Sequence, residues 1–263
     1  MARSKVNLHQ IQMNAFRLNK NQISWTFLSE AAKWSNQNVN GKAMLNFTQA
    51  RTNMVDSQLR PNGVTDGRIL DAMQSVMREN FVGRAQQSLA YMDGDVVLNE
   101  ATVGPRFLIE PMAFARMLQV AELDPSDRVL DVGAASGYSA AVLSKLVSHV
   151  IALEQDAGLA ALARQNLAGL ANVGIVEGSL AQGSPSSELF DLIVIEGRID
   201  EVPNELFSQV KDGGRVVAAI GTRDNAKCCV YSISGHTHTK RAAFDISIAA
   251  LPGFGKPKTT FAF

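Results

Sequence analysis

Short apolar runs alternate with amphipathic stretches along the second half of the chain, beyond the polar segment Asp124–Asp127. The runs with the length and β-branched content of strands are 128–132, 150–153, 173–176, 191–195 and 215–220. Helical patterns lie between them near 138–147, 158–169 and 203–210. Apolar strands that alternate with helices predict a Rossmann-like, doubly wound, mostly parallel α/β sheet. Two more strand-like runs between Cys228 and Ile248 predict an antiparallel edge.

The preceding stretch is helical in pattern rather than strand-like. Apolar residues recur with a period near 3.6 from Leu45 until the run ends at Arg60-Pro61. Thr65 and Asp66 can cap a second helix, a loop region is expected over 81–104, and Pro111 stands at the start of a third helix. The sheet is therefore expected to be preceded by N-terminal helices.

Residues 1–43 differ in composition from the rest, with six Lys or Arg against a single acid, Glu30. They fit either a basic arm with a partner or an extension outside the folded domain, and an organelle-targeting segment is a third option. We favour the extension, because the well-patterned sequence opens at Met44. The expected organisation is a weakly ordered extension over 1–43, a helical, substrate-side region over 44–123 and a cofactor-binding domain over 124–263.

Charge and cysteine content narrow the classes of function. Lys+Arg and Asp+Glu balance at 25 each, so we expect neither a nucleic-acid nor a membrane partner. Cys228 and Cys229 are neighbours whose side chains would point to opposite faces of a strand, so they should not form a disulfide. We expect a cytoplasmic protein without a metal site, and nothing in the sequence sets its oligomeric state.

The first strand runs into a glycine-containing turn, within Val129-Leu-Asp-Val-Gly-Ala-Ala-Ser-Gly-Tyr138. Gly133 and Gly137 bracket this turn, which opens onto a helix whose free N–H groups can face a ligand. Any strand–helix–strand unit needs such a turn, so the motif alone also fits a turn without a ligand.

Two carboxylates favour an adenosine-containing ligand. Glu154 ends the second strand, where an acid can accept both ribose hydroxyls. Asp131 lies two residues before Gly133, where it would repel a pyrophosphate but attract an amino group and a sulfonium. Ala140 stands where a dinucleotide fingerprint has its third glycine. S-adenosylmethionine is therefore the expected cofactor, ahead of a dinucleotide or of a purely structural turn.

Further candidates follow the third and fourth strands. Gly178 and Ser179 lie where the adenine would be, and Glu196 ends the fourth strand at the ligand-binding edge of the sheet. Glu196 could instead form an ion pair with Arg198 or with a neighbouring helix. The expected cofactor-binding residues are Asp131, Gly133, Ala134, Ser136, Gly137, Glu154, Gly178, Ser179 and Glu196.

The sequence from about Met44 to Phe263 resembles the protein-L-isoaspartate O-methyltransferase family. The residues that carry the resemblance lie at 51–59, 76–82, Glu110-Pro111, 115–117, 129–138, 190–194 and 213–216. The resemblance implies a methyltransferase that uses S-adenosylmethionine, acts on isoaspartyl residues of damaged proteins and thereby starts their repair. It also implies a class I methyltransferase fold.

The sequence departs from the family pattern on the acceptor side. Ile109 stands where the family has Ser, Ser179 where it has an acid, and Glu196-Gly-Arg198 where it has small residues. The acceptor-side candidates are Ile109, Glu110, Glu196 and Arg198, and no catalytic residue is assigned. A methyltransferase with another acceptor, or a non-catalytic relative that still binds the cofactor, stay open as alternatives.

Overall fold

The structure is a computed structural model that describes residues 46–98, 101, 104–235 and 237–254. The chain divides into two units, Met1–Leu45 and Asn46–Phe263. The first unit, with Trp25, Trp34 and the segment expected to be an extension, lies outside the described residues.

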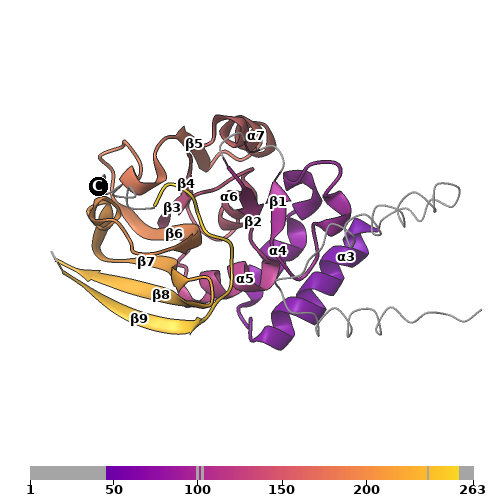
Figure 1. Cartoon of the computed structure of the whole chain (residues 1–263), viewed down its shortest axis with the longest axis horizontal. Helices are drawn as coiled ribbons and strands as arrows, with labels where there is room; N and C mark the ends of the chain where they lie inside the picture. The colour runs from indigo at the N-terminus through magenta and orange to yellow at the C-terminus, as the bar shows by residue number, and fades with distance from the viewer. Residues whose placement is uncertain (1–45, 99–100, 102–103, 236, 255–263) are drawn as a thin grey trace, which may run out of the picture. The chain divides into compact units, whose positions relative to one another are not determined.

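A seven-stranded sheet forms the centre of the second unit. Its strands are β3 (Arg128–Val132), β4 (His149–Glu154), β5 (Val173–Glu177), β6 (Phe190–Ile199), β7 (Val210–Thr222), β8 (Asn225–Ser234) and β9 (Thr237–Asp245). They are ordered β5-β4-β3-β6-β7-β8-β9, which Figure 1 shows descending from β5 at the top to β9 at the bottom. The five strands β5, β4, β3, β6 and β7 pair in parallel, and β8 and β9 extend the sheet by antiparallel pairing. The predicted doubly wound sheet with an antiparallel edge is confirmed.

The central strands β3, β4 and β6 bury both of their faces, in two separate apolar clusters. On β3, Val129 contributes to one cluster and Leu130 to the other, as the two-residue period of a strand requires. The first cluster also takes residues from α5 (Pro111–Val120), α6 (Tyr138–Leu143) and α7 (Ala157–Leu167), and the second from α8 (Asn204–Phe207). Cys228 and Cys229 fall in opposite clusters and are both unbridged, as expected.

Two of these helices are shorter than the sequence pattern indicated. Helix α6 ends at Leu143 rather than near residue 147, and α8 ends at Phe207 because β7 already begins at Val210. The apolar residues beyond each helix remain buried in the following turn or strand, so hydrophobic pattern alone overextended the helices.

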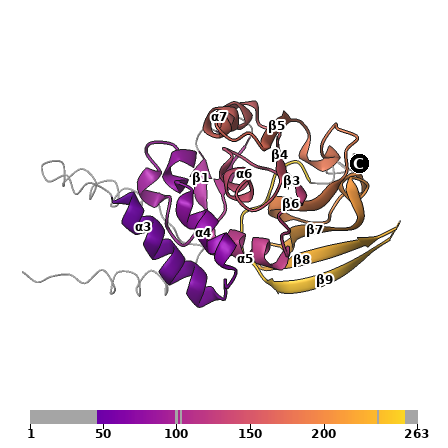
Figure 2. The same ribbon diagram turned by 180° about the vertical axis from the view of Figure 1, so that it is seen from behind.

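Helical segments before the sheet lie beside α5 and α6 (Figures 1 and 2). They are α3 (Phe47–Met54), the π-helical turn η1 (Val55–Leu59), η2 (Arg60–Asn62), α4 (Gly67–Ser75), η3 (Arg78–Phe81) and η4 (Gln87–Leu89). The Asp66 carboxylate accepts a hydrogen bond from the Arg68 N–H at 2.9 Å and caps α4, as predicted. In the described part of the chain, no helix is long and apolar enough to cross a lipid bilayer.

A small hairpin was not predicted. Strand β1 (Val96–Leu98) pairs antiparallel with β2 (Arg106–Leu108), with Leu98 opposite Arg106. The prediction of a loop over 81–104 is therefore wrong at Val96–Leu98. A strand of three residues is too short to show an alternating pattern in the sequence. The hairpin matters for function because it carries Arg106.

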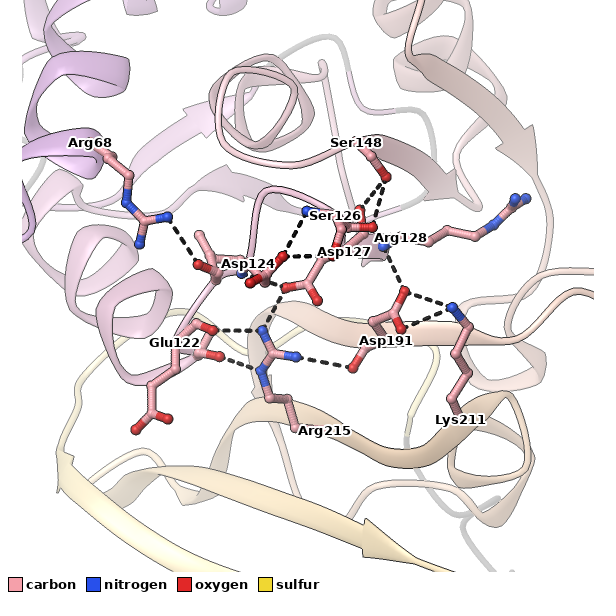
Figure 3. Close-up of polar contacts among 12 residues, drawn as sticks. Arg68, Glu122, Asp124, Ser126, Asp127, Arg128, Ser148, Asp191, Lys211 and Arg215 are labelled. Atoms are coloured by element: carbon pink, nitrogen blue, oxygen red, sulfur yellow. Dashed lines mark hydrogen bonds and ion pairs between the residues drawn. The ribbon is translucent and has the colours of Figure 1, made fainter.

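The amino ends of β3, β6 and β7 are tied together by a polar network (Figure 3). The Arg215 guanidinium binds the Asp127 carboxylate at 2.6 Å and the Glu122 carbonyl at 2.9 Å. Asp191 accepts a hydrogen bond from the Arg128 N–H at 2.8 Å and from the Lys211 ammonium at 2.9 Å. This network fixes the loop between α5 and β3 and leaves the opposite, carboxyl edge of the sheet for a ligand.

Candidate active site

The turn between β3 and α6 has a backbone shape that requires glycine. Gly133 and Gly137 have φ of 86° and 97°, a region that other residues rarely adopt. A Cβ on Gly137 would lie 2.7 Å from a Leu167 methyl carbon, so the close approach of α7 also excludes a side chain there. Ala135 has φ of 52°, which is uncommon for a residue with a Cβ and typical of functional turns.

Three predicted acids gather beside this turn on one face of the sheet. Asp131 pairs with Ala152 of β4 and with Val194 of β6. Glu154 and Glu196 each lie two residues further along those neighbouring strands, so the alternation of side chains places all three acids on the same face. All three are buried, with 0% exposure at Asp131 and Glu154 and 9% at Glu196.

Glu154 ends β4 but is shielded from solvent, with 0% exposure. Its carboxylate accepts hydrogen bonds from three backbone N–H groups, those of Ala135 at 2.8 Å, Gln155 at 2.9 Å and Asp156 at 2.9 Å. It also forms a two-pronged ion pair with the guanidinium of Arg106, in which the Nη2–Oε2 distance is 2.8 Å. The carboxylate expected to bind a ribose therefore already has an internal partner.

Asp131 and Glu196 are less well satisfied. The Ser139 hydroxyl donates to one Asp131 oxygen at 2.6 Å, whereas Asp131 Oδ1 and Glu196 Oε1 have no hydrogen-bond partner. Burial raises the pKa of Asp131 to about 7, with a smaller contribution from the charge of Glu154. Burial and then repulsion from Asp131 raise the pKa of Glu196 well above its usual value. Two such acids are suited to a ligand that brings positive charge, such as an ammonium and a sulfonium group.

Arg78 and Tyr138 form a buried polar pair near Glu196 that the sequence reasoning missed. The Arg78 guanidinium is fully buried and lies 4.6 Å from the centre of the Tyr138 ring. It donates to the carbonyls of Ala90 and Ile109 at 2.7 Å each, while Arg78 Nη1 and the Tyr138 hydroxyl have no partner. Burial lowers the pKa of Arg78 and raises that of Tyr138. The signal in the sequence that could have identified this group is the position of Arg78 inside the family-like run 76–82.

The remaining cofactor candidates lie at the carboxyl edge of the sheet and differ in how far they are exposed. The Gly178 N–H donates to the Glu154 carbonyl at 3.0 Å, so this residue lies beside the end of β4, whereas the Ser179 side chain is exposed. Ala134 and Ser136 are buried in the turn. The Ser136 hydroxyl donates to the Phe81 carbonyl at 2.5 Å and so links the turn to the N-terminal region.

The acceptor-side candidates do not form one cluster. Ile109 is 4% exposed and packs in the apolar cluster shared with α5, and Glu110 is its partly exposed neighbour at the cap of α5. Arg198 donates to the Gly221 carbonyl at 2.9 Å. Among the described residues, no ion pair joins Glu196 to Arg198 or to a residue of a neighbouring helix, so the ion-pair alternative for Glu196 is wrong.

A segment near the C-terminus covers the turn and was not anticipated. Leu251 donates its N–H to the Arg198 carbonyl at 2.9 Å, which fixes the segment to the end of β6. A Cβ on Gly133 would lie 2.9 Å from a Leu251 methyl group, and one on Gly197 would lie 2.8 Å from Leu251 Cβ. Both glycines thus let this apolar residue close over the site.

A parallel sheet whose first turn is glycine-rich, with an acid ending the second strand, is the architecture of a nucleotide-type site. Acids on β3 and β6 in place of phosphate-binding groups define it further as a site of the S-adenosylmethionine-dependent methyltransferase class. Comparison with known proteins agrees with this class and narrows it. The model of the Protein-L-isoaspartate(D-aspartate) O-methyltransferase family matches residues 49–243, and the chain belongs to this family.

Relatives of similar length share this name. A protein-L-isoaspartate O-methyltransferase of Herpetosiphon aurantiacus is 35% identical over 220 residues, which are 81% of this chain and 96% of the relative. One from Koribacter versatilis is 36% identical over 178 residues, or 67% of this chain and 78% of the relative.

Solved structures of the same name have the same fold. One protein-L-isoaspartate O-methyltransferase superposes with a TM-score of 0.68 at 25% identity and covers 79% of this chain and 66% of its own. A putative Plasmodium falciparum enzyme in complex with S-adenosyl-L-homocysteine has a TM-score of 0.65 at 20% identity, over 79% of this chain and 99% of its own.

Proposed function

We propose that this protein transfers a methyl group from S-adenosylmethionine to the free carboxylate of L-isoaspartyl residues in damaged proteins. Its membership of the protein-L-isoaspartate(D-aspartate) O-methyltransferase family supports both the reaction and the protein substrate. The observation that carries the proposal is the grouping of Asp131, Glu154 and Glu196 on one face of the sheet beside the glycine turn.

The three acids would divide two tasks in binding the cofactor. Glu154 would accept hydrogen bonds from the ribose hydroxyls, and Gly178 and Ser179 would border the adenine. Asp131 and Glu196, each with an unsatisfied oxygen, would face the cationic methionine end of the cofactor. Gly133, Ala134, Ser136 and Gly137 would shape the turn around it. The residues present thus fit S-adenosylmethionine, because its positive charge compensates acids that are otherwise costly to bury.

The reaction requires little chemistry from the protein. When bound, the cofactor would supply an activated methyl group: an O–C bond to the acceptor carboxylate forms as the C–S bond breaks, and the sulfur leaves as a neutral thioether with the electron pair. A carboxylate acceptor is ionised at neutral pH, so the protein needs no general base. Its side chains have to orient the two reactants and exclude water, and Leu251 over the glycine turn serves the second purpose.

We place the acceptor on the side of residues 44–123, next to Ile109 and Glu110, and the cofactor within 124–263. A methyltransferase of the same fold with another acceptor is a second candidate. It is favoured by one observation, the buried apolar side chain of Ile109 where the family pattern has a hydroxyl. Glu196, which lies within β6, adds negative charge near the site and also favours this second candidate.

Methyl transfer from labelled S-adenosylmethionine to synthetic peptides tests the proposal. A peptide with one L-isoaspartyl residue should become labelled, and the same peptide with aspartate should not. A base-labile label would identify a methyl ester. Labelling of neither peptide by a protein that still binds the cofactor would favour the second candidate, which a panel of small-molecule acceptors can then examine.

A further inference from the structure

Arg106 occupies the position where the cofactor is expected to bind. Its guanidinium is 2% exposed and holds Glu154 with two nitrogens, and its Nη2 also donates to the Gly133 carbonyl at 3.0 Å. The same arginine therefore contacts both the expected ribose-binding carboxylate and the glycine turn.

Glu154 has no capacity left for a ribose while Arg106 is in place. It accepts hydrogen bonds from the N–H groups of Ala135, Gln155 and Asp156 as well as from Arg106. The three backbone donors belong to the turns that end β3 and β4, so they are fixed by the fold. The side chain of Arg106 comes from the separate hairpin strand β2 and is the partner that a ribose can displace.

A displaced Arg106 needs a new anion. A buried guanidinium without a counter-charge is strongly unfavourable, and a sulfonium beside it adds to the cost. The acceptor of the proposed reaction is itself a carboxylate, and an arginine can hold one carboxylate oxygen while the other remains available to react. Arg106 lies three residues from Ile109 on the segment leading into α5, so it joins the cofactor side to the acceptor side.

We propose that Arg106 changes partners during the reaction: it binds Glu154 before the cofactor enters and the isoaspartyl carboxylate afterwards. This inference rests on the proposed function. It makes the two reactants bind in order, because the acceptor site has its positive charge only after the ribose has released Arg106 from Glu154. It also assigns acceptor recognition to an arginine in a chain whose family-type hydroxyl position is Ile109.

Chemical modification of the wild-type protein tests the exchange without a mutation. Phenylglyoxal, which reacts with accessible arginines, is applied to the full chain alone, with S-adenosylhomocysteine, and with S-adenosylhomocysteine plus an isoaspartyl peptide. Mass spectrometry then measures modification at Arg106, with the half-exposed Arg60 as internal reference. We expect Arg106 to react when S-adenosylhomocysteine is bound and to be protected again by the peptide. An Arg106 that stays unmodified in all three states overturns the exchange.

Binding measurements on Arg106→Gln provide the second test. We expect S-adenosylhomocysteine to bind this variant at least as tightly as the wild type, because Glu154 is no longer occupied. In the wild type, S-adenosylhomocysteine should tighten binding of the isoaspartyl peptide by about tenfold or more, and the variant should lose this effect. Arg106→Lys should retain part of it.

Arg128→Gln is the matched control, since Arg128 forms an ion pair with Glu188 at the opposite end of the sheet. Its binding of both ligands should equal that of the wild type. Peptide binding by Arg106→Gln that S-adenosylhomocysteine still enhances would contradict the proposal. A wild-type protein that binds no S-adenosylhomocysteine would instead refute the proposed function, and the inference with it.

Discussion

Asp131 is a buried acid whose ionisation should follow cofactor binding. Its pKa is raised from 3.8 to about 7, so the folded, cofactor-free protein binds a proton that the unfolded chain releases between these values. The contribution of Asp131 to the free energy of unfolding is therefore most favourable at low pH, where the acid is neutral in both states. This contribution is lost as the pH rises through about 7. An ammonium group placed beside Asp131 reverses this preference, because it stabilises the charged form.

We therefore predict that S-adenosylhomocysteine binds more tightly as the pH rises from about 6 to about 8, by up to roughly tenfold per pH unit below the pKa. Calorimetric titrations in buffers with different ionisation enthalpies should show proton release on binding in the same range. Asp131→Asn should bind more weakly and with a flatter pH dependence, apart from what Glu196 contributes. Equal affinity of the wild type at both pH values would contradict this assignment.

Ile109 tests whether a hydroxyl is needed on the acceptor side. We expect Ile109→Ser to raise isoaspartyl methylation, and to cost about 2–4 kcal/mol of stability because Ile109 is buried in an apolar cluster. Ile109→Thr and Ile109→Val form a pair of nearly equal shape that differs by the hydroxyl. The rate of methyl transfer, measured well below the melting temperatures, should be higher for Thr than for Val. Equal rates would show that the hydroxyl has no role in this protein.

At the scale of elements, helices and strands were predicted best from the sequence where they depend on neighbouring residues. The observed β3 has the predicted bounds, Arg128–Val132, and Asp66 caps α4 as expected, because each depends on local residues. The β1–β2 hairpin depends on pairing between short segments, which a local pattern does not show. The acids of the site were identified from their spacing, whereas the pairing of Arg106 with Glu154 joins residues 48 apart in the chain.

The polar network of Figure 3 should stabilise the sheet without affecting the site. We predict that Arg215→Met lowers the free energy of unfolding by about 2–3 kcal/mol, because Asp127 and the Glu122 carbonyl lose a largely buried partner. Lys227→Met removes an exposed pair with Asp245 and should leave the free energy of unfolding nearly unchanged. Urea unfolding measures both values. Equal, small losses for the two variants would show that the network adds little.

At the scale of the whole molecule, residues 1–43 should be separable from the enzyme. The family model matches from residue 49, and the regular hydrophobic pattern begins near Leu45. We predict that a chain lacking residues 1–43 has a melting temperature within about 2 °C of the full chain. Its affinity for S-adenosylhomocysteine should also be unchanged. A loss of several degrees, or of cofactor binding, would show that this segment belongs to the folded enzyme.

The central claim is that the glycine turn and Glu154 bind S-adenosylmethionine, and calorimetric titration with S-adenosylhomocysteine tests it most directly. The wild type should bind this product with micromolar affinity, about −8 kcal/mol, and should not bind NAD. Glu154→Gln, checked for folding by its melting temperature, should weaken binding by about 1–3 kcal/mol because the ribose hydroxyls lose a charged acceptor. Binding of NAD without binding of S-adenosylhomocysteine, or full affinity in folded Glu154→Gln, would contradict the account.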